Sequence, residues 1–165
     1  MVQTKCGFDS GPQVAGADLL LLNGPTLLVN IGFDPDYKDP QTTPKPPAAG
    51  VSKLPALVDT GATECCIDNL LAATLKLPIV DRRLVAGSAG SHLANVYLAQ
   101  VHIVTLNYTI YGAFAGVDLA AGGQAHSALI GRTFLRNFTM TYEGRTGTVI
   151  ISNGRVEDWR GVPKV

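Results

Sequence analysis

The sequence predicts an all-β domain that carries one or two short helices. Eighteen glycines and ten prolines interrupt the 165-residue chain, and the apolar runs between them have the length of strands rather than of long helices. Apolar residues make up 46% of the chain and charged residues only 16%, which is typical of a folded domain. A chain of this length can bury a core within a single domain.

Turn residues separate the expected strands. Asn23-Gly24-Pro25 predicts a hairpin between the apolar runs on either side of it, and Glu143-Gly144-Arg145 predicts another near the end of the chain. A third hairpin is expected around a small, flexible tip at Gly87–Ser91. The expected strands are Asp18–Leu22, Thr26–Phe33, Leu54–Val58, Arg83–Ala86, His92–Leu98, Val101–Ile110, Tyr111–Val117, Ala128–Gly131, Thr139–Tyr142 and Thr146–Ser152.

Two short helices and one long loop complete the expected architecture. Asp68 suits the N-cap of a helix over Asn69–Lys76, with Pro78 as its stop, and Arg132–Phe138 has the length of two helical turns. The proline-rich segment Asp34–Gly50 is expected to be an exposed loop. It either connects strands through solvent or contacts substrate at the rim of a cleft. Residues 1–16 are polar, and are expected to be mobile or to cover a sheet edge.

Charge and cysteine content narrow the function classes. The formal net charge is zero, so we expect neither nucleic acid nor a membrane surface as partner. The run Ala17–Leu22 is too short to span a bilayer, and the N-terminus lacks the apolar core of a signal peptide. Of the three cysteines, the neighbours Cys65 and Cys66 would point to opposite faces of a strand. Cys6 could pair with either, but nothing requires it, so a cytoplasmic location is expected.

The segment Ala56–Ala62 carries the candidate chemistry. Three apolar residues lead directly into Asp59, and a carboxylate at the end of a core strand needs hydrogen-bond partners. Thr60 supplies a hydroxyl that can anchor the turn, and Gly61 lets a backbone N–H approach the carboxylate. The pattern therefore predicts a rigid support, formed by Thr60, Gly61 and Ala62, that aims Asp59 into a cavity.

Three segments together resemble the retropepsins, which are homodimeric relatives of pepsin. Leu57–Ala62 is similar to the Asp-Thr-Gly-Ala turn of that family's active site, and Leu129–Arg132 is similar to the apolar-apolar-Gly-Arg segment that precedes its C-terminal helix. The hairpin Leu84–Leu98 is similar to the family's flap, and Arg132–Gly147 looks like bacterial members. The residues of the flap tip would be Gly87, Ser88, Ala89, Gly90 and Ser91, and those packed under the site Ile130, Gly131 and Arg132.

The resemblance implies a retropepsin-like acid protease barrel over residues 25–152, with an N-terminal extension and first strand in 1–24 and a tail in 153–165. It also implies an aspartic endopeptidase that cuts a peptide or protein substrate. One Asp-Thr-Gly supplies half of the catalytic pair, so the second Asp59 must come from a twofold-related copy in a homodimer. The two carboxylates would share one proton and activate a water.

No metal or cofactor is expected. The three histidines His92, His102 and His126 have no ligand spacing with the cysteines, and each is expected on the surface or in a loop, although His102 lies in a strand and faces either way. Chemistry at this site therefore rests on carboxylates and water alone.

Several points stay open at the level of sequence. Thr63 stands where many retropepsins have an acidic residue, so Arg132 pairs with Glu64, with another group, or with the dimer interface. The tip at Gly87–Ser91 is either a plain turn or a mobile flap. Two other functions fit the same segments: a catalytically silent retropepsin-like module for dimerisation or peptide capture, and a monomeric small-ligand β-barrel.

Overall fold

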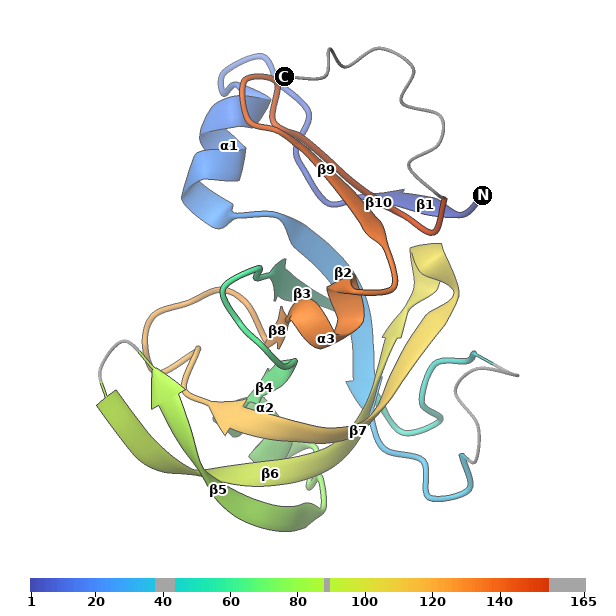
Figure 1. Ribbon diagram of the computed structural model, residues 1–165, viewed down its shortest axis with the longest axis vertical. Helices are drawn as coiled ribbons and strands as arrows, with labels where there is room; N and C mark the ends of the chain where they lie inside the picture. The colour runs from blue at the N-terminus through green and yellow to red at the C-terminus, as the bar shows by residue number, and fades with distance from the viewer. Residues whose placement is uncertain (38–43, 88–89, 155–165) are drawn as a thin grey trace.

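The computed structural model describes residues 1–37, 44–87 and 90–154 and consists mainly of strands (Figure 1). Six strands form a closed barrel, because β2, at one end of the seven-stranded sheet, also pairs with β6, the strand next to the other end. In their order around the barrel they are β2 (Thr26–Gly32), β3 (Gly50–Val58), β8 (Ala128–Ile130), β4 (Cys66–Asp68), β7 (Tyr108–Val117) and β6 (Gly90–Ile103). The all-β prediction is confirmed at this level.

Alternate side chains of the strands fill the barrel. In β2, Leu27, Val29 and Ile31 are at most 2% exposed, while Leu28 between them is 58% exposed. This alternation follows from the pleat, which turns successive side chains to opposite faces. Burial of one aliphatic side chain contributes about 1.5–3 kcal/mol, so the pattern fixes which face of the strand points inward.

A hairpin extends from the barrel wall. Strand β5 (Ile79–Gly87) pairs antiparallel with the first half of β6, from Ile79 opposite Tyr97 to Gly87 opposite Gly90. The hairpin predicted around Gly87–Ser91 is therefore confirmed, with longer strands than expected. Ser88 and Ala89 of its tip lie outside the described residues.

A smaller sheet has the order β1 (Gln3–Lys5), β10 (Thr148–Ser152) and β9 (Thr139–Glu143). The hairpin β9–β10 confirms the second predicted turn, at Glu143-Gly144-Arg145. Of the two expectations for residues 1–16, covering an edge is the correct one for β1, because Thr4 pairs with Ile151.

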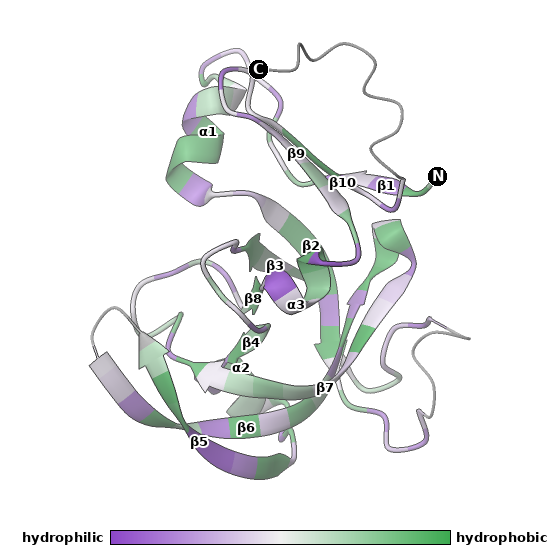
Figure 2. Cartoon of the chain, in the orientation of Figure 1, coloured by the Kyte–Doolittle hydropathy of each residue, from purple (hydrophilic) through white to green (hydrophobic). Residues whose placement is uncertain are grey.

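The first predicted hairpin is wrong. Asp18–Leu22 is not a strand but part of helix α1 (Gly16–Asn23), which is apolar over most of its length (Figures 1 and 2). Alanine and leucine favour helix, and this run contains no β-branched residue. Gly24, with φ of 67°, ends the helix and donates its N–H to the carbonyl of Leu20. The turn residues thus mark a helix C-terminus, and the described chain has three α-helices instead of one or two.

The other helices are shorter than predicted. Asp68 caps α2 (Asn69–Thr74) as expected, since its carboxylate accepts the N–H of Leu71, but Lys76 at φ 51° ends the helix early. Helix α3 (Arg132–Leu135) covers only the first half of Arg132–Phe138.

The strand predicted at Val101–Ile110 is two strands. The short 3₁₀ turn η1 (Val104–Leu106) separates β6 from β7. Asn107 follows in the left-handed conformation with φ 46°, which asparagine tolerates better than most residues.

The proline-rich segment is anchored at both of its described ends. Tyr37 is buried, and the backbone N–H and carbonyl of Asp34 both bond the side chain of Gln100, which is 1% exposed. Lys45 accepts at its carbonyl from Thr109. Most of the described residues of this segment are exposed, as expected, but the segment is not purely solvated, because Gln100 and Thr109 bond its two described ends.

All three cysteines are buried and unbridged. Among the described residues, no helix has the length and apolar character needed to cross a membrane.

Candidate active site

Asp59 follows the last residue of β3, at the point where two parallel strands end together. Val58 of β3 lies opposite Ile130 of β8, and the Asp59 N–H donates to the Ile130 carbonyl at 3.0 Å. The chain then turns tightly, because the Ala62 N–H donates back to the Asp59 carbonyl at 3.2 Å. These bonds place the half-buried Asp59 side chain at the open end of the strand pair.

The predicted support of the carboxylate is present in part. The Gly61 N–H donates to Asp59 Oδ1 at 2.8 Å, as expected from the sequence. The Thr60 side chain, in contrast, anchors nothing within the described chain: its hydroxyl makes no hydrogen bond there and is exposed to solvent. The Thr60 hydroxyl therefore takes no part in holding this turn within the described chain, and it is accessible to another molecule.

The Arg132 side chain holds the turn through three hydrogen bonds. Its Nη1 donates to the carbonyls of Thr60 at 2.8 Å and Gly61 at 3.0 Å, and its Nη2 donates to Thr63 Oγ1 at 2.8 Å. The sequence leaves open whether Arg132 pairs with Glu64, with another group or with the dimer interface. The structure shows the second, since its partners belong to the turn. The planar guanidinium suits this role, since its donors point in fixed directions.

Gly131 makes the close contact between the two segments possible. A Cβ at this position would lie 2.4 Å from the carbonyl oxygen of Glu64 and 2.9 Å from that of Ala62. The backbones bond directly here, with the Arg132 N–H donating to the Ala62 carbonyl at 2.9 Å. Gly131 and Arg132 thus contact the backbone of the segment that follows Asp59.

A groove of about 730 Å³ runs between this turn and the β5–β6 hairpin. One wall contains Asp59 and the residues that follow it, and Leu84, Val85, Ala86 and His92 of the hairpin form the other wall. The β5–β6 hairpin, which resembles the flap of retropepsins in sequence, therefore borders the same groove as Asp59.

An ion pair joins the two walls. Arg83 of β5 contacts the Glu64 carboxylate, and both side chains line the groove. Sequence reasoning missed Arg83, because only the barrel decides which hairpin residue faces the turn. The sequence alone suggests Glu64 as a partner for Arg132, whereas the structure pairs it with Arg83.

Cys66 also lines the groove, although only 9% of its surface is exposed. Burial raises the pKa of its thiol to about 11, so the group is a neutral side chain at physiological pH. Cys65 beside it faces inward and accepts the Gly131 N–H at its sulfur.

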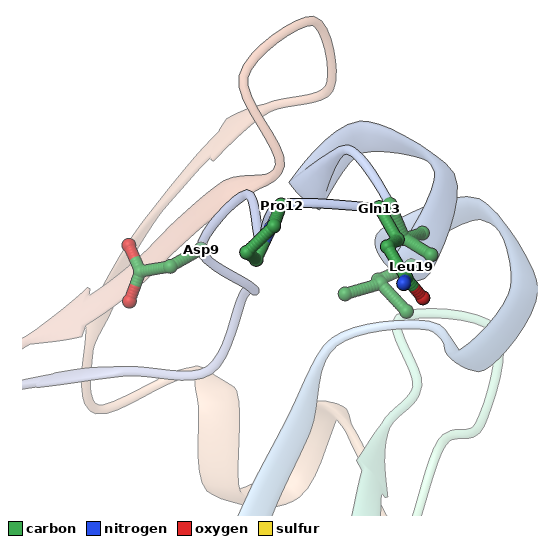
Figure 3. A pocket seen from close by; sticks show the side chains of 6 residues that line it. Asp9, Pro12, Gln13 and Leu19 are labelled. Atoms are coloured by element: carbon green, nitrogen blue, oxygen red, sulfur yellow. The ribbon is translucent and has the colours of Figure 1, made fainter.

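A second hollow, of about 480 Å³, lies on another side of Asp59. It is lined by Pro25, Val58, Asp59, Thr60, Met140 and Tyr142. A third hollow, of about 370 Å³, lies away from Asp59, between α1 and the loop before it, and includes Asp9, Pro12, Gln13 and Leu19 (Figure 3).

His126 lies in a loop, as expected, but it is buried, and His102, whose direction the sequence leaves open, is buried as well. His102, 3% exposed, shares a hydrogen bond with Thr109 Oγ1 at 2.9 Å, and His126, 9% exposed, shares one with Thr26 Oγ1 at 2.9 Å. Burial lowers the pKa of both imidazoles. His92 alone is exposed as expected, at the groove.

No family model matches this chain, and no curated protein matches it either.

Proposed function

We propose that this chain is one subunit of a homodimeric, retropepsin-like aspartic endopeptidase, with Asp59 as its catalytic residue. One observation carries the proposal. The Asp59 carboxylate accepts the Gly61 N–H at 2.8 Å and lines a groove. The β5–β6 hairpin lines the opposite wall of this groove. A carboxylate oriented by backbone groups and open to a groove suits general acid–base work on a bound peptide.

The chemistry requires two carboxylates. Asp59 and Asp59 of the partner subunit, within about 3 Å of each other, would hold one proton between them. The ionised carboxylate accepts a proton from a water, whose oxygen attacks the carbonyl carbon of the peptide. The protonated carboxyl donates to the carbonyl oxygen. The C–N bond then breaks as the nitrogen receives a proton, which yields a free acid and an amine.

The surrounding residues have positioning roles in this proposal. Arg132 and Gly131 keep the turn rigid, so the carboxylate retains one orientation during the reaction. The hairpin wall would cover an extended peptide lying in the groove, and the exposed Thr60 hydroxyl would contact the second copy.

The runner-up function is a silent module that binds peptides without cutting them. A buried pair of carboxylates is unfavourable to form, and peptide capture gains nothing from it. The small-ligand barrel would act as a monomer, so sedimentation separates it from both.

The test compares the wild type with Asp59→Asn on a mixed peptide pool at acidic and near-neutral pH, with sedimentation of the same samples. We expect the wild type to cut and Asp59→Asn to lose at least about 10³-fold in rate while still dimerising. Asp36→Asn, an exposed aspartate outside the groove, is the matched control and should retain full activity.

Two results would contradict the proposal. Equal cutting by the wild type and Asp59→Asn would remove Asp59 from the mechanism. A wild-type dimer that binds peptides without cutting any of them would favour the silent module.

A further inference from the structure

Helix α1 presents leucines on nearly every side. Leu20 is 2% exposed and packs into the core, and Leu19 lines the hollow between the helix and the preceding loop (Figure 3). Leu21 and Leu22, however, are 82% and 79% exposed. A helix that is apolar all round is typical of one that is covered on all sides, and Asp18 is the one charged residue of α1.

The C-terminal end of α1 is fastened beside the catalytic strand. A Cβ on Gly24 would lie 2.5 Å from Leu57 Cδ1, and the Val58 N–H donates to the Pro25 carbonyl at 2.8 Å. Pro25 lines the same hollow as Asp59. Leu22 precedes Pro25 by three residues, so their Cα atoms are at most about 11 Å apart.

The proposed dyad fixes where the second copy must lie. If the two Asp59 carboxylates share a proton, a twofold axis passes beside this side chain. The surface around the axis then faces the same surface of the other copy. That surface includes the hollow of Pro25, Met140 and Tyr142, and Tyr142 is 56% exposed.

We propose that Leu21 and Leu22 pack against the second copy of this chain and belong to the contact that completes the active site. This inference rests on the proposed function. It assigns a role to the N-terminal extension, residues 1–24, which the sequence places before the catalytic domain. Figure 2 shows the apolar helix above the loop that follows β3, with the β5–β6 hairpin on the other side of that loop. Dimer contact and substrate groove would thus lie on opposite sides of Asp59.

The test uses Leu21→Glu/Leu22→Glu in the full chain, with Leu70→Glu as the matched control. Leu70 is a leucine on α2 that is 67% exposed and lines neither hollow of Asp59. We expect sedimentation to show a dimer dissociation constant raised at least about a hundredfold for the double variant. The control should stay within about threefold of the wild type. Cleavage by the double variant should return as its concentration is raised.

A milder variant guards against misfolding. Leu21→Ala/Leu22→Ala should raise the dissociation constant about tenfold while circular dichroism shows unchanged strand content. If both double variants dimerise like the wild type, the inference is wrong. The proposed function survives that result as long as Asp59→Asn still abolishes cleavage, whereas a wild type that is monomeric at every concentration overturns both.

Discussion

At the scale of single residues, the site depends on donors that belong to distant parts of the chain. Arg132 lies 72 residues from Thr60, yet its guanidinium bonds two carbonyls and one hydroxyl of the turn that follows Asp59. A lysine would keep the charge but not the fork of fixed donors.

We therefore expect Arg132→Lys to lower kcat/KM at least about tenfold. Its free energy of unfolding should fall by about 1 kcal/mol, since the lost hydrogen bonds are charge-assisted but exposed. Peptide cleavage and urea unfolding measure the two effects. Arg136→Lys, exposed at the end of α3, is the control and should change neither. An Arg132→Lys enzyme with wild-type kcat/KM would show that the turn needs no guanidinium.

Gly131 is required for space rather than for an unusual backbone conformation. Its φ is −89°, which any residue adopts, but an added Cβ would meet the Glu64 carbonyl oxygen at 2.4 Å. Backbone atoms cannot yield without displacing the turn.

We expect Gly131→Ala to lower the free energy of unfolding by about 2 kcal/mol, as overpacking does, and to reduce cleavage as the turn shifts. Urea denaturation measures the first effect. Gly11→Ala is the control, because its Cβ would meet nothing closer than 3.9 Å. Equal stability of both variants would mean that the segment of Gly131 can move away from Glu64 at little cost in free energy.

The sequence predicts the local half of this site and leaves the rest open. The bond from Gly61 to Asp59 spans two residues, so the tripeptide alone implies it. The partner of Arg132 depends on how β3 and β8 align, which no local pattern contains. The Thr60 hydroxyl shows the converse, since it is suited to anchoring the turn, yet backbone groups and the Arg132 side chain hold the turn instead.

At the scale of elements, α1 and the β5–β6 hairpin show how turn signals are read. Gly24 and Pro25 would end either a strand or a helix over the residues before them. Only the run of leucines indicates that this segment is a helix. The β5–β6 hairpin was predictable because its glycine-containing tip lies between two runs of strand length. Its position over Asp59 follows from the barrel, in which β6 pairs with β5, β7 and β2.

The ion pair of Glu64 and Arg83 connects this hairpin to the turn that follows Asp59. We expect a double-mutant cycle of Glu64→Gln and Arg83→Gln to give a coupling of about 0.5–1 kcal/mol at low salt, because both side chains are partly exposed. Urea unfolding at low and high salt measures it, and the coupling should shrink at high salt. The exposed pair Lys5 and Asp9, far from the hairpin in sequence, serves as comparison and should give less. A coupling of zero at low salt would show that this ion pair does not stabilise the contact between the hairpin and the turn.

At the scale of the whole molecule, closure of the barrel buries polar groups as well as apolar ones. The fold class follows from short apolar runs and frequent turns. The buried polar contacts do not, because His102, His126 and Gln100 look like surface residues until the pairing of distant strands covers them. Each is held by a hydroxyl or backbone partner from another part of the chain.

These two histidines give the fold a dependence on pH with a definite sign. Burial holds the pKa of His102 and His126 below the ordinary value of 6.5, so the unfolded chain binds more protons than the folded one near that pH. Stability should therefore be full above pH 6.5 and be lost as the pH falls through 6.5 toward the folded-state pKa values.

Urea unfolding between about pH 7.5 and 5.5 measures how the free energy of unfolding depends on pH before most carboxylates titrate. We expect His102→Gln/His126→Gln to flatten it and His92→Gln, at the exposed position, to leave it unchanged. A wild-type slope retained in the double variant would assign the acid sensitivity to groups other than these two histidines.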